Sequence, residues 1–378
     1  MSKFRRSWRS TAAGGALWLL AFVSQSVLAA PAISGASGTF DHKASVTISG
    51  SSFGTKSTAA PLVWDDASGT SFSSKWDGAW PNNNSAYNTT YRATMRGINP
   101  PHSRVGKYIA GGHGDSAGAN GGYNVAFWKN VPASVSYVYA SWYQRVDDAW
   151  VFGGDNNLKT FAYSNCCSPY EMPNNWYLAY GPPNPSSKTS GAGWIINDDG
   201  GSLGNPDING HNAWWGGAVN PMAGQWSKVE VAIKVSSGSD GYVKVWENGT
   251  QEVGYAGPTD KYPGTSRTIG IGGYARIYGQ PNNWRYFADA YVDTSLARVV
   301  LANKATLSTA TVIENQIPTS WSAGSVTASV NLGKFTAGQT AYLIVVDPSG
   351  SASPGFAVTV GGSASQKTPK APSAVDAE

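Results

Sequence analysis

Residues 137–146, YVYASWYQRV, alternate in character along the chain, which is typical of a β-strand with two different faces. The first face is mainly apolar and suits a core: Val138, Ala140, Trp142, Gln144 and Val146. The second face is aromatic and basic: Tyr137, Tyr139, Ser141, Tyr143 and Arg145. An ordinary solvated face would carry Lys, Glu and Thr. A row of three tyrosines and an arginine indicates instead a groove that holds sugars.

A second short strand is expected after the Gly-Gly-Asp loop at 153–155. Its alternation places three side chains on one side: Lys159, Phe161 and Tyr163. If this strand pairs with the first one in a single sheet, Lys159 shares the groove with Tyr143 and Arg145. The two segments together therefore predict a basic trough lined by tyrosines.

The rest of the chain also favours β-structure. Long helical periodicity is absent, and 45 glycines, 19 tyrosines and 16 tryptophans favour many turns and aromatic surfaces. The segment SKVEVAIKV at 227–235 alternates, which predicts a half-buried outer strand with a charged solvent face. The Asn248–Gly249 pair predicts a tight hairpin. The chain is therefore expected to be all-β.

The N-terminus has the features of a secretory signal: a basic start, an apolar run and small residues at a cleavage point after Ala29. The protein is therefore expected to be secreted, to the periplasm or outside the cell. Later segments show no run that is long and apolar enough to span a bilayer. Four of the 27 basic residues lie in the signal, which leaves 23 against 23 acidic residues. This balance gives no support for a nucleic-acid partner.

Cys166 and Cys167 are the two cysteines of the chain, so a core rather than a disulfide framework must hold the fold. The two residues are adjacent. A strained vicinal disulfide and a pair of free thiols both fit the sequence, and both interpretations stay open.

Residues 31–60 hold about two strands, which cannot form a sandwich by themselves. The segment VTISGSSFG at 46–54 resembles the turn that opens IPT/TIG immunoglobulin-like domains, and residues 299–361 resemble the remaining strands of that domain type. We therefore expect one discontinuous Ig-like domain, 31–60 joined to 299–361, with a larger domain at 62–298 inserted. A complete C-terminal sandwich with a separate N-terminal strand pair is the alternative. The Ser, Ala, Lys and Pro-rich tail at 362–378 is expected to be disordered.

The inserted domain resembles the concanavalin-A-like jelly-roll polysaccharide lyases, of the alginate, glucuronan and heparin lyase type. The resemblance rests on the tyrosine-rich strand, the Gly-Gly loop and the lysine that opens the next strand. It also rests on the order of three later segments: GQWSKVEVAIKV, GIGGYARIYG and YFADAYVD. It implies a jelly-roll sandwich that binds an anionic polysaccharide in the groove of its concave sheet.

Two kinds of glycan cleavage make different demands on side chains. Hydrolysis needs a pair of carboxylates, and the insert holds four glutamates and no ExDxE-type strand. Asp65, Asp66, Asp155 and Glu171 keep hydrolysis open. β-Elimination needs cationic or amide donors that neutralise the uronate carboxylate, and a Tyr or His that removes the C5 proton. The Tyr, His, Lys and Arg side chains of the insert favour elimination.

Five residues are predicted to carry the reaction. Tyr143 is the leading acid or base, with Arg145 and Lys159 neutralising the substrate carboxylate. His113 lies in the glycine-dense segment AGGHGDSAGANGGYN, where a side chain can approach a ligand closely. Tyr278 is the alternative acid or base. The structural alternatives are a tyrosine used only for packing and a glycine-rich segment that is only a turn.

Seven further residues are predicted to bind substrate. Arg92 and Arg96 are four apart, so on one strand they share a face, as in the arginine-bearing groove strand of alginate-lyase jelly rolls. Met95 replaces the glutamate that usually stands between those arginines. The others are aromatic or cationic: Tyr139, Tyr163, His211, Arg276 and Trp284. The alternatives are surface ion pairs for the arginines, a hydrogen-bonded structural His, and core positions for the aromatic residues.

Metal signals are weak. Asn205, Asp207 and Asn209 resemble the start of a calcium loop, but Gly216 stands at the twelfth position, where a bidentate acid is needed. No His/Cys spacing indicates zinc, and no phosphate-binding glycine loop occurs. No cofactor or metal is therefore expected, with a structural Ca²⁺ as the alternative.

The sequence predicts a secreted, monomeric polysaccharide lyase that acts on a uronic-acid polymer. A non-catalytic carbohydrate-binding or adhesion protein on the same scaffold is the second hypothesis, because a fold alone does not determine function. A glycan hydrolase with an unrecognised acid pair is the third.

Overall fold

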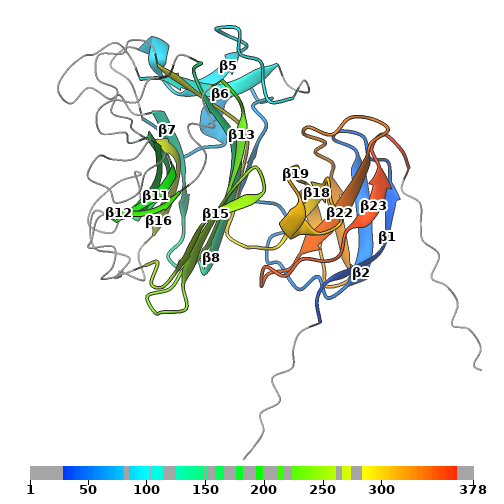
Figure 1. Ribbon diagram of the computed structural model, residues 1–378. Coiled ribbons are helices and arrows are strands. Elements are labelled where there is room, and N and C mark those ends of the chain that lie inside the picture. The colour runs from blue at the N-terminus through cyan, green and yellow to red at the C-terminus, as the bar shows by residue number, and fades with distance from the viewer. Residues whose placement is uncertain are drawn as a thin grey trace, which may run out of the picture.

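The computed structural model describes residues 29–80, 85–102, 104, 106–113, 125–148, 150, 158–165, 176–181, 193–198, 212–216, 224–260, 266–273 and 283–363. In these ranges antiparallel strands form two sandwiches (Figure 1). Short 3-10 helices occur at Phe72–Ser74, Ser85–Tyr87 and Leu307–Thr309. The prediction of an all-β chain with a larger and a smaller sandwich is confirmed.

One sheet of the larger sandwich has eight strands. Its spatial order is β15 (Thr250–Ala256), β14 (Tyr242–Glu247), β13 (Ser227–Lys234), β8 (Tyr137–Val146), β17 (Trp284–Asp293), β6 (Lys107–Gly112) and β5 (Thr90–Ala93). The short strand β3 (Val63–Asp65) pairs with β17 outside this path. This sheet lies between the other sheet of the larger sandwich and the smaller sandwich (Figure 1).

The other sheet has seven strands. Its spatial order is β12 (Asn212–Gly216), β11 (Gly193–Asp198), β10 (Trp176–Gly181), β9 (Leu158–Asn165), β16 (Arg267–Gly273), β7 (Val125–Val131) and β4 (Gly78–Ala79). Strand β16 thus pairs with both β7 and β9 at the middle of the sheet.

The core of the larger sandwich fills the space between these two sheets. The predicted apolar face of β8 points into this core, where Val138, Ala140 and Trp142 are fully buried. Trp142 stacks on Phe161 of β9 with the ring centroids 5.8 Å apart. Burying each large apolar side chain contributes about 1.5–3 kcal/mol. Burial of the inner-face side chains is therefore enough to determine which face of β8 points into the core.

The smaller sandwich contains strands from both ends of the chain. Its first sheet runs β1 (Ala32–Gly38), β2 (Ser45–Ser51), β21 (Ser325–Ser329) and β20 (Ile317–Trp321). Its second sheet runs β19 (Ile313–Asn315), β18 (Arg298–Ala302), β22 (Thr340–Val346) and β23 (Phe356–Thr359). Phe40 and Phe53 from the N-terminal part pack with Val299, Leu301 and Leu343 in one core.

Two local predictions have different outcomes. The hairpin at Asn248–Gly249 is confirmed, because it joins β14 to β15 with φ values of 48° and 81°, as a tight primed turn requires. The charged solvent face predicted for residues 227–235 is wrong. Lys228 and Glu230 are only 6% and 5% exposed, because that face of β13 meets the smaller sandwich.

Three predictions lie outside the described residues: the signal segment before residue 29, the Cys166–Cys167 pair and the tail beyond residue 363. The calcium-loop segment at 205–209 also lies outside them. Within the described ranges, no helix has the length and apolar character needed to cross a bilayer.

Candidate functional site

The predicted trough of Tyr143, Arg145 and Lys159 does not form. Strand β8, which carries Tyr143 and Arg145, belongs to the eight-stranded sheet, and β9, which carries Lys159, belongs to the seven-stranded sheet. The expectation that the two strands pair is therefore wrong. Successive strands of a sandwich can cross from one layer to the other, and alternation within each strand does not reveal the crossing.

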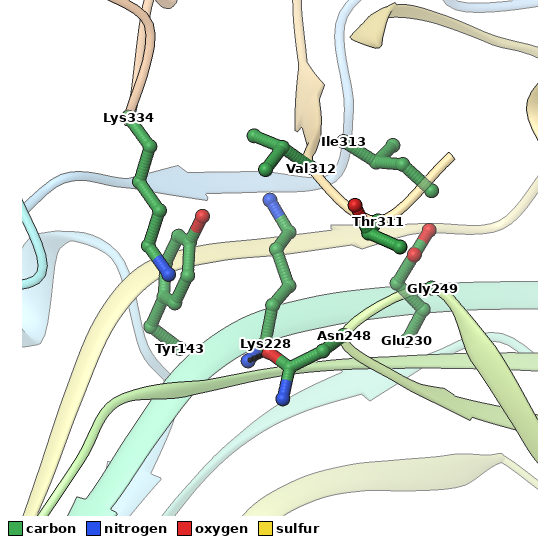
Figure 2. A pocket seen from close by; sticks show the side chains of 9 residues that line it. All are labelled: Tyr143, Lys228, Glu230, Asn248, Gly249, Thr311, Val312, Ile313 and Lys334. Atoms are coloured by element: carbon green, nitrogen blue, oxygen red, sulfur yellow. Dashed lines mark hydrogen bonds between the residues drawn. The ribbon is translucent and has the colours of Figure 1, made fainter. Parts of the chain in front are cut away.

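Tyr143 lies at the contact between the two sandwiches. Its hydroxyl donates a hydrogen bond to Glu314 Oε1 at 2.6 Å, and its ring is 1% exposed. The Nζ atoms of Lys228 and Lys334 lie 4.9 and 4.7 Å from its ring centroid (Figure 2). Burial and the charge of Glu314 hold the pKa of Tyr143 well above its ordinary value. The predicted acid or base role of Tyr143 is wrong, since the hydroxyl is buried and already bonded.

Two other predicted tyrosines are also buried. The hydroxyl of Tyr139 donates to the carboxylate of Glu230, and the guanidinium of Arg298 lies 4.1 Å from its ring centroid. Tyr163 points into the core of the larger sandwich, 5.9 Å from the guanidinium of Arg267. Neither ring is free to face a substrate, so the predicted substrate contacts of Tyr139 and Tyr163 are wrong.

Lys159 lies on the opposite face of β9 from the one expected. Leu158 and Phe161 both point into the core, and the pairing with β10 shifts by one residue between them. This bulge at Thr160 places Lys159 on the outer face of the seven-stranded sheet. The prediction that Lys159 shares a side with Phe161 and Tyr163 is therefore wrong.

Arg92 and Arg96 do not share a strand. Strand β5 ends at Ala93, and Arg96 adopts a φ of 55° in the turn between Met95 and Ile98. Arg92 donates to three backbone carbonyls and lies 4.9 Å from the ring centroid of Trp284. The predicted common face is wrong because a turn, rather than a strand, follows Ala93.

Three more predicted residues, Trp284, Arg145 and Arg96, lie at or beside the outer face of β17. Trp284 is 6% exposed beneath Arg92 and Tyr87, as the core alternative requires. Arg145 forms an ion pair with Asp148. Arg96 Nε donates to Asp147 at 3.2 Å, and this carboxylate also accepts from the Tyr286 hydroxyl at 3.0 Å.

The structure brings two predicted residues, His113 and Lys159, to one end of the larger sandwich. The ends of β6 and β9, which carry or adjoin these residues, meet the ends of β16 and β17 there through hydrogen bonds. We refer to this region as the loop end, and define it by His113, Trp150, Lys159, Gly273, Asn283 and Arg285.

Arg285 holds the loop end together. Its side chain is 1% exposed, and Nη1 donates to the carbonyls of Lys159 at 2.7 Å and Gly273 at 3.2 Å. Arg285 lies on β17 in the eight-stranded sheet, whereas both acceptors lie in the seven-stranded sheet. One buried guanidinium therefore ties the two sheets beside Lys159.

His113 follows β6 and joins the same region. Its backbone N–H donates to the carbonyl of Asn283 at 2.8 Å, and its ring packs edge to face on Trp150 with the centroids 5.4 Å apart. The His113 side chain is 1% exposed. One residue, Trp284, separates Asn283 from Arg285, so the start of β17 lies between the backbone contacts of His113 and Lys159.

Two buried amide groups near Arg285 have unused hydrogen-bond donors. Gln144 Oε1 accepts from Trp142 Nε1 at 3.1 Å, which fixes the orientation of the amide and leaves Gln144 Nε2 without a partner among the described residues. Asn283 Nδ2 is also buried, and the described part of the chain offers it no partner. Such donors are unfavourable unless a ligand or water satisfies them. Amide donors of this kind suit the recognition of a carboxylate.

Several predicted residues cannot be placed. Arg276 and Tyr278 lie outside the described residues, in the segment between Gly273 and Asn283, whose two flanks belong to the loop end. His211 also lies outside them, as do Asp155 and Glu171.

Asp65, one of the acids that kept hydrolysis open, has a structural role. It is 1% exposed and accepts hydrogen bonds from Trp76 Nε1 at 2.7 Å and from the Tyr91 hydroxyl at 3.0 Å. Burial raises the pKa of Asp65, although these hydrogen bonds oppose the rise. Among the described residues, no group of three or more His, Cys, Asp or Glu side chains is arranged to hold a metal ion.

Sequence reasoning missed Arg285 and Glu314. A signal for Arg285 was present, because it shares strand parity with Phe287 in the otherwise apolar and aromatic run WRYF. A cation at an inward position of a strand must have a partner. Glu314 has no comparable signal, since its partners Tyr143 and Lys228 are far away in the sequence.

Neither the protein-family models nor the curated proteins include a match to this sequence. Solved structures do show a likeness in fold. An endo-β-1,4-glucuronan lyase from the fungus Trichoderma reesei is 13% identical, with 59% of this chain and 92% of that chain covered and a TM-score of 0.39. The alginate lyase Aly36B is 12% identical, with 69% and 98% covered and a TM-score of 0.38.

The carbohydrate recognition domain of Emp47p is also similar, at 12% identity, with 59% of this chain and 98% of that chain covered and a TM-score of 0.33. The neighbours thus include both lyases and a sugar-recognition domain. At these identities and scores, none of them decides the activity of this chain.

Proposed function

We propose that the chain is a secreted polysaccharide lyase that cleaves a uronic-acid polymer by β-elimination at the loop end. The proposal is carried by the meeting of the chain segments of His113, Lys159 and Asn283 at the loop end, through Arg285 and backbone hydrogen bonds. Two buried amide donors near Arg285, Gln144 Nε2 and Asn283 Nδ2, have no partner among the described residues. These are the group types that elimination needs: a base, a cation and neutral donors. The smaller sandwich is proposed to be of the IPT/TIG type.

Each group has a proposed role. Lys159 and the amide of Asn283 neutralise the substrate carboxylate, which makes the C5 proton more acidic. His113 removes that proton. Tyr278, in the segment bounded by Gly273 and Asn283, returns a proton to the leaving oxygen. Arg276 and His211 are proposed to contact neighbouring sugars.

The test is the ultraviolet absorbance of the unsaturated uronate, measured with alginate, glucuronan, heparin and pectin. We expect absorbance to rise with at least one polymer. His113→Gln should lower kcat by about 10²–10⁴-fold, the range for loss of a general base. Lys159→Met should lower kcat by about 10²–10³-fold. Lys304→Met, at an exposed position in the smaller sandwich, is the matched control and should leave turnover unchanged.

Thermal unfolding of each variant separates lost folding from lost chemistry. Full activity of His113→Gln would transfer the base role to another residue and contradict the proposed mechanism. New reducing ends without a rise in absorbance would show that the protein cleaves by hydrolysis and not by elimination.

Binding without cleavage is the second candidate function. Two observations favour it: His113 and Lys159 are only 1% and 5% exposed, and a base must reach its substrate. Trp80 and Trp128 also form a half-buried edge-to-face pair, 6.4 Å between centroids, beside the seven-stranded sheet. Calorimetric binding of a polymer that yields neither absorbance nor reducing ends would establish this function instead.

A further inference from the structure

A second candidate site lies between the two sandwiches, away from the loop end. A cleft of about 780 Å³ is bounded on one side by β13, β14 and β15. On the other side it is bounded by β18, the 3-10 helix Leu307–Thr309 and the turn at 349–355. Ligand sites in proteins are typically about 300–1,000 Å³, so this cleft has room for an oligosaccharide.

Strand β14 supplies an aromatic wall. Tyr242, Lys244 and Trp246 alternate with Val243 and Val245, whose side chains point into the core, so the first three share the outer face. All three line the cleft. The two residues are four positions apart, so the rise of the strand sets their Cα atoms about 13 Å apart, which allows the two rings to stack on different sugars of one chain.

The charges of the cleft favour an anionic ligand. Lys244 is exposed, and its Nζ lies 4.9 Å from the ring centroid of Tyr242. Arg298 is 9% exposed. The one carboxylate among the described lining residues, Glu230, already accepts from the Tyr139 hydroxyl. The cleft therefore presents two cationic side chains, Lys244 and Arg298, and one carboxylate that already accepts a hydrogen bond.

Arg298 also has an unused donor. Its Nη1 donates to the carbonyl of Leu296 at 2.9 Å, and its guanidinium stacks on Tyr139. Its Nε is buried and has no partner among the described residues. A buried donor without a partner at the wall of a cleft is satisfied when a ligand oxygen occupies the cleft. The same wall of the cleft adds the hydroxyls of Thr306, Ser308 and Ser349.

We propose that this cleft binds a segment of an acidic oligosaccharide without cleaving it. Tyr242 and Trp246 stack on sugar rings, and Lys244 and Arg298 bind carboxylates. The described lining residues include no histidine, and burial raises the pKa of their one tyrosine, Tyr242, which disfavours its use as the base of an elimination. The proposal rests on the proposed function only for the class of sugar, since it concerns a different surface.

The test is calorimetric titration of the full chain, in a His113→Gln background that limits cleavage. The probes are hexasaccharides of glucuronic acid, of mannuronic acid and of neutral glucose. We expect an acidic hexasaccharide to bind more tightly than the neutral one. Trp246→Ala should weaken binding by about three- to tenfold, the range for loss of one aromatic contact. Lys244→Met should weaken it and reduce its salt dependence.

Lys304→Met is the control, because Lys304 is exposed in the smaller sandwich and does not line the cleft. Unchanged affinity in both Trp246→Ala and Lys244→Met would overturn the proposal. Equal affinity for neutral glucose would also overturn it. So would a concentration-dependent dimer that Trp246→Ala dissolves, since a second copy would then occupy the cleft. If the absorbance assay fails while these titrations succeed, the lyase proposal alone falls.

Discussion

The hydroxyl of Tyr143 donates to Glu314 Oε1 at 2.6 Å and thereby joins β8 of the larger sandwich to β19 of the smaller one. Lys228 Nζ binds the other carboxylate oxygen at 3.0 Å, and the backbone N–H of Lys334 donates to Oε1 at 3.0 Å. Glu314 and Tyr143 are almost fully buried. The charge and all three donors are thus satisfied within the contact between the sandwiches.

Tyr143→Phe tests the structural role of this hydroxyl. Glu314 keeps Lys228 and the Lys334 amide, so we expect a loss of about 1 kcal/mol in the free energy of unfolding. Chemical denaturation measures the loss. Turnover and glycan binding should match those of the wild type. A large fall in kcat at unchanged stability would return Tyr143 to the active site.

Glu314→Gln should be more damaging. It leaves the ammonium of Lys228 buried without its counter-charge, and breaking a buried ion pair in this way costs about 3–5 kcal/mol. Lys228→Met combined with Glu314→Gln removes both charges and should recover part of the stability in a double-mutant cycle. Additive losses in the double variant would show that the two side chains do not interact.

The sequence pattern correctly predicted those features of the fold that depend on residues close together in the chain. The inward face of β8 follows from alternation, and the β14–β15 hairpin follows from Asn248–Gly249, because both depend on residues adjacent in the chain. The outward face of β8 was misassigned for a physical reason. Tyr143 suits a sugar groove and a domain contact equally well, since both need an apolar ring with a polar tip.

The site could be predicted only in part. His113 and Lys159 were recognisable as residue types, and the structure places both at the loop end. Their faces and neighbours were not predictable, because one extra residue at Thr160 reverses the outward side of β9. The tie through Arg285 joins residues more than a hundred positions apart, which no local pattern encodes.

His102 should make stability depend on pH. Its Nε2 lies 2.7 Å from Asp289 Oδ2. Burial favours the neutral ring, but the hydrogen bond and charge of Asp289 outweigh it, so the pKa of His102 is raised above its ordinary value of 6.5. A raised histidine pKa stabilises the fold fully below the unfolded value, and this contribution is lost as pH rises through the folded value.

His42 has the opposite sign, since burial and then the charge of Arg104 lower its pKa. The comparison of wild type with His102→Gln cancels this effect except for the smaller part that the charge of His102 itself contributes. Between about pH 6 and pH 8, the wild type should lose more unfolding free energy than His102→Gln does. Parallel curves for the two proteins would show that the Asp289 contact does not hold the proton.

Arg285→Lys tests whether the loop end depends on its guanidinium. A lysine keeps the charge, but its side chain is one bond shorter and its ammonium is not held in a planar guanidinium, so we expect it to lose at least one of the two carbonyls, Lys159 O and Gly273 O. An unsatisfied buried carbonyl costs about 1–3 kcal/mol, measurable by denaturation. Faster amide hydrogen exchange should be confined to the ends of β9 and β16. If the proposed lyase is correct, kcat should fall about tenfold or more, since small displacements of positioning groups slow catalysis.

Arg267→Lys, at the opposite end of β16 and paired with Asp260, is the control: it should lower stability and leave kcat unchanged. Equal kcat in both variants would show that Arg285 supports the fold without positioning the site.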